Sequence, residues 1–301
     1  MSTAVLPAVV MRRPRPSFPG AVRSELLKIG RQWLTWVLLA GFVAITAIVL
    51  VVTAVAGNPR AALAANPLRF YLTYLSGVEQ VFTTCSGIVL LIVGSRLVSM
   101  EYGNGTIRLV LARGTSRLGL LGAQYAALAI TGVLLLAGFA VVCAVYLFAV
   151  VTAWHGSFSP ITSLPSAAWA DTWRNVLVAV VSMTVCILLA TAAAVVGRSV
   201  AFGVGVAVAF FPADNFAVIV MVLMTRITHQ DVWVNATQYF LGPILNQLPA
   251  SLQPDHPVNA AFITPFVQGI DATHCWVVIG VYSAAFLVAS VVLTWRRDVL
   301  H

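Results

Sequence analysis

Six long apolar runs constrain the fold of this chain more than any other feature of its sequence. They lie near residues 34–56, 79–98, 118–151, 175–196, 200–224 and 275–295. About 20 apolar residues cross the ~30 Å hydrocarbon core of a bilayer as a helix, so each run is long enough to span it. Only 9% of the residues are charged and the mean hydropathy is +0.96, whereas soluble domains carry about 25% charged residues. We therefore expect an all-α, polytopic membrane protein with six transmembrane helices.

The distribution of arginine predicts the orientation of these spans. Of the 17 Lys and Arg residues, 13 face the cytoplasm if the N-terminus does, and four face outside: Arg60, Arg69, Arg174 and Arg226. Cytoplasmic loops carry such an excess of Lys and Arg. Dividing the long run 118–151 into two crossings would place Arg198, Arg296 and Arg297 outside, against this bias. We therefore expect one long, tilted helix there, and both termini in the cytoplasm.

An amphipathic helix is predicted at residues 21–33, after a flexible, basic cytoplasmic tail at residues 1–20. Its apolar side chains recur at helical spacing on one face, and its charged side chains cover much of the rest. The apolar residues are Val22, Leu26, Ile29 and Trp33, and the charged ones are Arg23, Glu25, Lys28 and Arg31. Basic amphipathic helices lie in the membrane interface. We expect an interface helix here; the alternative is a plain extension of the first span.

The segment 99–117 is a short polar island between the second and third spans. It is predicted to form a cytoplasmic helix, with Ser99 or Thr106 as its N-cap, Glu101 near its N-terminal end and Gly114 after its last turn. The apolar ridge of this helix is Ile107, Val110 and Leu111, flanked by Arg108 and Arg113, and Arg117 opens the third span. Such a helix could dock into a soluble partner. Alternatively, its arginines only fix the topology.

Two stretches carry a resemblance to a known family. The pattern EYGNGTIRLVLARGTSR resembles the cytoplasmic segment of the ATP-binding-cassette (ABC) type-2 permeases, and RSELLKIGRQWLTW resembles their opening interface helix. The first matches at Glu101, Gly105, Thr106, Arg108, Leu111, Ser116 and Arg117, and the second at Arg23, Glu25, Lys28 and Trp36. The sequence departs from the family where Gly114 replaces a frequent proline and Gln124 a frequent lysine.

The resemblance implies a single permease domain over residues 21–301, with a coupling helix that contacts a separate ATPase subunit. It implies two copies of that ATPase, which bind ATP and Mg²⁺, and pairing with a second copy of this chain or with a similar permease. The implied coupling-helix contacts are Glu101, Thr106, Ile107, Arg108, Val110, Leu111, Arg113 and Arg117, with a second contact at Gly197, Arg198 and Ser199. The expected function is export of an amphiphilic or hydrophobic substrate across a bacterial cytoplasmic membrane. Lipid is an expected partner, and nucleic acid is not.

The sequence argues against catalysis by this chain itself. A P-loop needs Gly-Lys-Ser/Thr, but the only lysine, Lys28, follows SELL. We therefore expect a non-catalytic subunit with no cofactor of its own. The four cysteines form no CxxC pair, and the His and Asp residues of the segment 225–274 have no metal-ligand spacing, so we expect no metal site.

Asp214 is the most conspicuous carboxylate near membrane depth. It follows Pro212 and precedes Asn215 within the fifth run, and an intramembrane carboxylate by default marks a functional site. One interpretation is a gate or pathway contact formed by Pro212, Asp214 and Asn215. The other is that the helix ends early and Asp214 and Asn215 cap a second short segment. A proton-coupled secondary transporter that uses Asp214, or a non-transporting scaffold, is the alternative function.

Three further features carry expectations. Glu79 is expected at the outer edge of the second span, as an interfacial carboxylate. The apolar stretch 239–252 is expected to form a re-entrant or interfacial helix. Glycines in and beside the spans, among them Gly203 and Gly205, are expected to permit close helix contact.

Overall fold

The computed structural model describes residues 17–56, 58–103, 116–253, 263–267 and 269–296, and every regular element in these ranges is a helix. Six of the helices are long and apolar enough to cross a membrane. They are α2 (Trp33–Val55), α4 (Pro67–Gly103), α6 (Arg117–His155), α8 (Ser166–Gly197), α9 (Val200–Thr228) and α12 (Ala272–Arg296). The predicted all-α fold with six candidate spans is thus confirmed.

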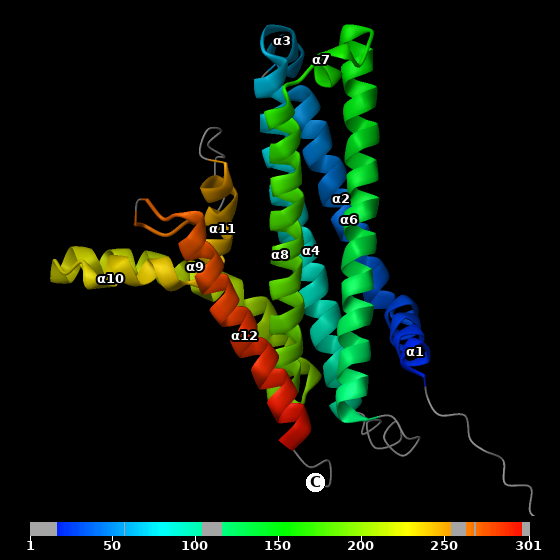
Figure 1. Ribbon diagram of the computed structural model, residues 1–301, viewed down its shortest axis with the longest axis vertical. Helices are drawn as coiled ribbons and strands as arrows, with labels where there is room; N and C mark the ends of the chain where they lie inside the picture. The colour runs from blue at the N-terminus through cyan, green and yellow to red at the C-terminus, as the bar shows by residue number, and fades with distance from the viewer. Residues whose placement is uncertain (1–16, 57, 104–115, 254–262, 268, 297–301) are drawn as a thin grey trace, which may run out of the picture.

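Short helices lie before and between the long ones. These are α1 (Phe18–Arg31), α3 (Pro59–Ala65), α7 (Ser159–Thr162), α10 (Val232–Ala236) and α11 (Leu241–Leu252), with a 3₁₀ turn at Thr237–Tyr239. The end of the molecule that holds α3 and α7 is called the α3 end below. The opposite end, where α4 and α12 finish and α6 begins and near which α1 lies, is called the α1 end (Figure 1).

Several helices are longer than the apolar runs that predicted them. The run 118–151 is one helix of 39 residues, as expected, which is about 58 Å long at 1.5 Å per residue. Helix α4 has 37 residues and begins 12 residues before the expected start at 79, so that Arg69 and Glu79 both lie within it. The extra turns are stabilised by packing near the α3 end, where Tyr71, Tyr74 and Ile161 are buried.

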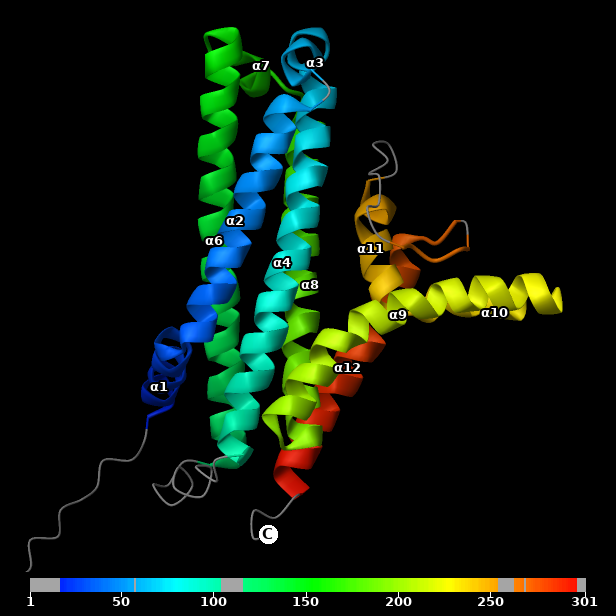
Figure 2. The same ribbon diagram turned by 180° about the vertical axis from the view of Figure 1, so that it is seen from behind.

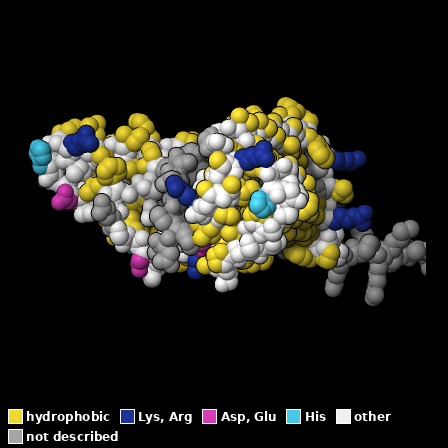
Figure 3. Space-filling view, turned by 90° about the horizontal axis from the view of Figure 1, so that it is seen from above, with side chains coloured by type: hydrophobic (Ala, Val, Ile, Leu, Met, Phe, Trp, Pro, Cys, Tyr) yellow, Lys and Arg dark blue, Asp and Glu magenta, His cyan; other side chains and the backbone are white. Residues whose placement is uncertain are grey.

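Helices α4 and α8 form the centre of the bundle. Over their most apolar 18 residues, 67% of α4 and 61% of α8 are buried, whereas only 11–22% of the corresponding stretches of the other four long helices are buried. Figures 1 and 2 show α2 and α6 on one side of this pair, and α9 and α12 on the other. The outward faces of the surrounding helices are largely apolar, and Figure 3 shows hydrophobic side chains over much of the surface seen from the α3 end, as a lipid environment requires.

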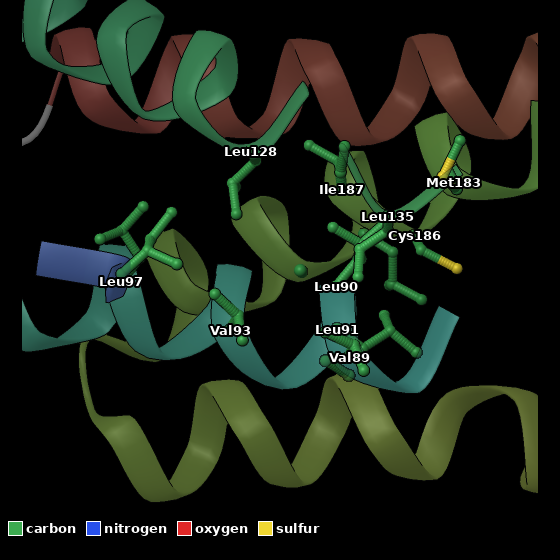
Figure 4. Close-up of a cluster of buried hydrophobic side chains, with 14 of the residues drawn as sticks. Val89, Leu90, Leu91, Val93, Leu97, Leu128, Leu135, Met183, Cys186 and Ile187 are labelled. Atoms are coloured by element: carbon green, nitrogen blue, oxygen red, sulfur yellow. The ribbon is translucent and has the colours of Figure 1, made fainter. Parts of the chain in front are cut away.

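The core between α4, α6 and α8 consists of interlocking aliphatic side chains. Leu90 and Val93 of α4 pack with Leu128 of α6 and Ile187 of α8 (Figure 4). Close approach here depends on small residues, because a Cβ atom on Gly94 would lie 3.1 Å from the Cβ of Ala190. Small residues allow apolar helices to pack closely where lipid supplies no hydrophobic driving force.

Helix α9 departs from the bundle. Its first half runs beside α4 and α8, and its second half turns away and projects sideways (Figure 2). Pro212 lies inside this helix, and proline removes one backbone hydrogen bond and bends a helix. The chain returns through α10 to α11, the helix expected at 239–252, whose side chains Leu241, Ile244 and Leu248 are fully buried.

Two glycines on α9 provide a test of this packing. A Cβ atom on Gly203 would lie 2.6 Å from the Ser99 hydroxyl and 3.1 Å from the Ala194 backbone, whereas a Cβ atom on Gly205 would meet nothing within 4 Å. We expect Gly203→Ala to lower the unfolding temperature in detergent, because α9 must move away from α4 and α8. Gly205→Ala should leave it unchanged or raise it, because alanine favours a helix by about 1 kcal/mol. Equal effects of the two substitutions would contradict the described position of α9.

Candidate functional site

Four elements that the sequence singled out lie toward the α1 end of the molecule. They are α1, the last turn of α4, the first turn of α6 and the turn between α8 and α9 (Figures 1 and 2). The connection of residues 104–115, which lies outside the described residues, begins and ends here. It includes the predicted coupling-helix residues Thr106, Ile107, Arg108, Val110, Leu111 and Arg113. Their predicted roles therefore stay predictions.

An ion cluster joins α1 to the end of α4. The Lys28 ammonium donates to a Glu25 carboxylate oxygen at 2.6 Å and also to the carboxylate of Glu101. Glu25 is 1% exposed and Glu101 is 5% exposed. The chain's single lysine thus bridges two buried carboxylates that lie 76 positions apart in the sequence.

This arrangement corrects two expectations from the sequence. Glu25 is expected among the charged side chains that cover the polar part of the interface helix, but α1 turns Glu25, with Val22 and Ile29, inward against the bundle. Glu101 and Ser99 were placed at the start of a separate helix, but both lie inside the last turns of α4, where Ser99 is fully buried. The physical reason is that α4 continues through the polar island as far as Gly103, which directs Glu101 at α1.

The charges in this cluster stabilise one another. Burial raises the pKa of Glu25 above its usual value, although the hydrogen bond and charge of Lys28 act in the opposite direction. Burial would lower the pKa of Lys28, but its hydrogen bonds with Glu101 and Glu25 outweigh this and raise the pKa above 10.5. Because this pKa is higher in the folded state, the contribution of Lys28 to stability is present at neutral pH. It is lost only as the pH rises through the folded-state value.

The remaining interface-helix residues behave differently. Arg23 and Arg31 are exposed. Trp33, expected as the last apolar residue of this helix and at headgroup depth, instead begins α2, and its side chain is 69% exposed. The indole N–H of Trp36 donates to the Gly30 carbonyl at 2.9 Å, which fixes the angle between α1 and α2. Exposed tryptophans at this junction are typical of headgroup depth.

The other end of the 104–115 connection is also well defined. The Ser116 hydroxyl accepts a hydrogen bond from the Gly119 N–H at 3.0 Å and caps α6. Arg117 is the first residue of α6 and lines the same small recess as Glu101 and Gln124. The connection is therefore anchored between two long helices whose adjoining turns contact a common recess.

The predicted Gly197–Ser199 turn joins α8 to α9. Arg198 has φ +52°, in the left-handed region, and its side chain is exposed. The Ser199 hydroxyl caps α9 by accepting from the Phe202 N–H at 3.2 Å. The ring of Phe202 fills the space that a Cβ atom on Gly197 would occupy, so glycine is required there. The turn presents one arginine at the α1 end; its contact with an ATPase stays a prediction.

A cavity of about 420 Å³ lies between α4, α8, α9 and α11. We call it the polar cavity, because amide and hydroxyl groups lie among its apolar lining residues. The polar lining residues are Gln80, Thr83, Thr84, Ser182, Asn215 and Asn246, and Pro212 also contributes. Of the three predicted pathway residues, Pro212 and Asn215 line this cavity, and Asp214 does not.

Asp214 connects two helices instead. Its carboxylate accepts a hydrogen bond at 2.6 Å from the backbone N–H of Gly242, in the first turn of α11. Beside it, the side-chain amide of Asn246 donates to Asn215 at 3.2 Å. The expectation that the helix ends early at this point is wrong, because α9 continues to Thr228. Asp214 does act as a cap, but of α11, a neighbouring helix.

Two features of this site were missed in the sequence. Gln80, Thr83 and Thr84, followed by Gly87, recur at i, i+3, i+4 and i+7, which is one helix face inside an apolar run. That spacing was a usable signal. The assignment of Glu79 to the outer edge is also wrong. Phe82, one turn from Glu79, contacts Phe42 with ring centroids 6.1 Å apart, and Phe42 is the tenth of the 23 residues of α2. Glu79 therefore lies inside the span, as the 13th of the 37 residues of α4 and one turn from the level of the middle of α2.

Comparison with known proteins decides the family. A family model described as ABC-2 family transporter protein matches residues 21–214, about two thirds of the chain. The chain belongs to the ABC-2 transporter family. It is therefore a multi-pass membrane permease, and the family implies pairing with an ABC ATPase subunit. Compared individually with curated proteins, this ABC-2 permease matches none.

The bounds of the matched region show which helices resemble the family. It begins at the first residues of α1, includes the ion cluster and the 104–115 connection, and ends at Asp214. The projecting half of α9, α11 and α12 lie beyond it. Within the described part of the permease, no three His, Cys, Asp or Glu side chains are grouped as a metal site would require, and the four cysteines are free.

The ion cluster yields a prediction about stability. Lys28→Met should lower the free energy of unfolding by about 2–3 kcal/mol, because it leaves two buried carboxylates without their cation; the partial exposure of Lys28 keeps the loss below that of a fully buried pair. The triple variant Glu25→Gln/Lys28→Met/Glu101→Gln should recover much of the loss. Arg31→Met, which removes an exposed cation from the same helix, is the control in thermal unfolding. A loss from Arg31→Met as large as that from Lys28→Met would contradict the assignment.

Two substitutions of Asp214 distinguish a structural role of its carboxylate from a role in proton transfer. Asp214→Asn retains an acceptor oxygen for the Gly242 N–H, so ATP-dependent transport and thermal stability should both be retained. Asp214→Leu removes the cap and should cost about 1 kcal/mol in unfolding measurements. If Asp214→Asn abolished transport in vesicles without changing stability, Asp214 would be a proton relay and the structural assignment would be wrong.

Proposed function

We propose that this ABC-2 permease is the membrane-spanning subunit of an exporter of amphiphilic or hydrophobic substrates. ATP hydrolysis takes place in two separate ATPase subunits, which bind ATP and Mg²⁺, and this chain is non-catalytic. Two permeases, either identical or similar, flank the pathway. The α1 end faces the cytoplasm of a bacterial cell, where the ATPases bind, and the excess of Lys and Arg on that side supports this orientation.

The observation that carries this proposal is the continuity of α4 between its two ends. Its last turn leads directly into the predicted coupling segment, and Gln80 lies 23 residues before Gly103, about 35 Å along the same helix. A long, buried helix transmits displacement without absorbing it. Motion imposed on residues 104–115 would therefore reach the polar cavity through a single rigid element.

The ion cluster extends this movement to α1. Because Lys28 holds the last turn of α4 through Glu101, a shift of α4 would carry the interface helix with it or break a buried ion pair. The second cytoplasmic contact, at Gly197–Ser199, begins α9, which lines the opposite side of the same cavity. Two contacts on the ATPase thus lead to two walls of one cavity, which is the geometry that alternating access requires.

The polar cavity also indicates the class of substrate. Its lining combines amides and hydroxyls with Ile88, Leu91 and Phe211, and the lining residues carry no formal charge. Such a surface suits a molecule with both polar and apolar parts better than a small ion. A gene for a P-loop ATPase next to the gene for this chain would further support the proposal.

A pull-down tests ATPase docking. The double variant Arg108→Glu/Arg113→Glu reverses two charges beside the predicted apolar ridge and should reduce co-purification of the ATPase by about tenfold or more. The matched control is Arg60→Glu/Arg69→Glu, the same charge change near the α3 end, which should leave co-purification unchanged.

Two outcomes would contradict the proposal. One is equal ATPase recovery with both double variants. The other is labelling of Thr106→Cys by a membrane-impermeant reagent added outside intact cells, because residues 104–115 would then be extracellular.

A further inference from the structure

A second cavity, of about 620 Å³, lies between α4, α6 and α8, toward the α3 end. We call it the aromatic cavity, because Tyr71, Tyr74, Phe82, Phe139, Phe148 and Trp169 contribute to its wall. It lies on the opposite face of α4 from the polar cavity, because at 3.6 residues per turn the two sets of α4 residues that line the cavities centre on opposite sides of the helix. Those sets are residues 71, 74, 75, 78, 79 and 82 for the aromatic cavity and residues 80, 83, 84, 87, 88 and 91 for the polar one. Its volume is typical of sites that bind organic molecules.

Among the described residues that line the aromatic cavity, Glu79 is the only one with an acidic or basic side chain, and it is 9% exposed. Among the described residues its carboxylate has neither a hydrogen bond nor an ion pair. The other polar lining groups have partners in the protein. Tyr71 bonds to Thr172 at 2.7 Å, the Tyr74 hydroxyl donates to the Cys143 carbonyl at 2.7 Å, and Asn175 accepts from Gln253 at 2.8 Å.

An unpartnered carboxylate within a membrane span is costly and by default marks a functional site. The protein avoids this cost elsewhere, because the buried Glu25 and Glu101 share Lys28 and the buried Asp171 pairs with Arg174 at 2.6 Å. The carboxylate of Glu79 therefore lacks a cation that the other buried carboxylates have. Aromatic rings around it would favour a cation further, because the face of a ring attracts positive charge.

The aromatic cavity opens toward lipid. Its lining includes Val145 and Phe148 of α6, which are 62% and 55% exposed, and Trp169 of α8, which is 42% exposed. These exposed side chains belong to apolar outer faces that hydrocarbon covers in a membrane. A ligand would enter sideways from the bilayer, so it must be soluble in lipid.

We propose that the aromatic cavity is a binding site for a hydrophobic monovalent cation, with Glu79 as its counter-ion. The apolar body of the ligand packs among the aromatic side chains, and its positive centre lies against the Glu79 carboxylate. This site is separate from the polar cavity and does not depend on the ATPase. Its failure would leave the exporter proposal standing, and the converse also holds.

Direct binding to the intact chain tests this proposal. The protein is placed in phosphatidylcholine nanodiscs, and binding of tritiated tetraphenylphosphonium is measured with empty nanodiscs as the background. We expect saturable binding that the neutral triphenylphosphine oxide displaces poorly. Glu79→Gln should weaken the affinity by about tenfold or more, as does loss of one partner of a desolvated charge pair. The control Asp231→Asn removes an exposed carboxylate and should have no effect.

A second pair of variants keeps the test decisive if Glu79→Gln does not fold. Ala144→Phe adds bulk to the lining while keeping Glu79, and should also weaken binding. Ala137→Phe, on an exposed part of the same helix outside the lining, should not. The proposal is overturned if Glu79→Gln binds the cation as tightly as the wild type. It is equally overturned if the neutral analogue competes as well as the cation, or if Ala144→Phe and Ala137→Phe bind alike.

Discussion

A peptide backbone in lipid has no water to bond, and this constraint determines the architecture of the permease. Each span must satisfy its own N–H and C=O groups as a helix, so the arrangement of polar groups is decided by side chains. Polar side chains act at the bend in α9. Pro212 lacks the N–H that would bond to the Val208 carbonyl, and beside it the side-chain amide of Asn215 donates to the Phe211 carbonyl at 2.8 Å. The carboxylate of Asp214 then satisfies a backbone N–H at the start of α11. The one helix that turns away from the bundle is thus fastened to its neighbour at the bend.

The same constraint explains which parts of the structure were predictable. Apolar length identified the six spans, because that signal is contained within a single helix, and the distribution of Arg between the loops favoured an undivided α6. Contacts between different helices leave no comparable pattern in the sequence. Nothing in the stretch around Glu101 shows that α4 continues through a polar island, because that depends on the packing of α1 against it. Helical spacing assigns Glu25 to the charged part of the interface helix. That its carboxylate is buried beside Lys28 follows only from the packing of α1 against α4.

The two sides of α4 have different chemical characters, and this difference follows from helical spacing. On one face of α4, residues 80, 83, 84 and 87 supply a side-chain amide, two hydroxyl groups and a glycine. Glu79 and Phe82 lie on the other face. A helix that moves as a rigid element therefore moves the walls of both cavities together. If an ATPase binds residues 104–115 as proposed, a displacement that reaches Gly103 would change the polar cavity toward α9 and the aromatic cavity toward α6 in the same step.

The two buried acidic sites differ in the source of the cation that neutralises them. The carboxylates at the α1 end have an internal cation, so the ion cluster stays neutralised whatever the bilayer contains. The carboxylate of Glu79 depends on what the membrane supplies, so occupation of the aromatic cavity would stabilise the positions of α4 in which the cavity is open. By linkage, a ligand that binds one conformation more tightly shifts the population toward it. A hydrophobic cation in the bilayer would then bias the same helix that the proposed ATPase contact would move, from the face opposite the polar cavity.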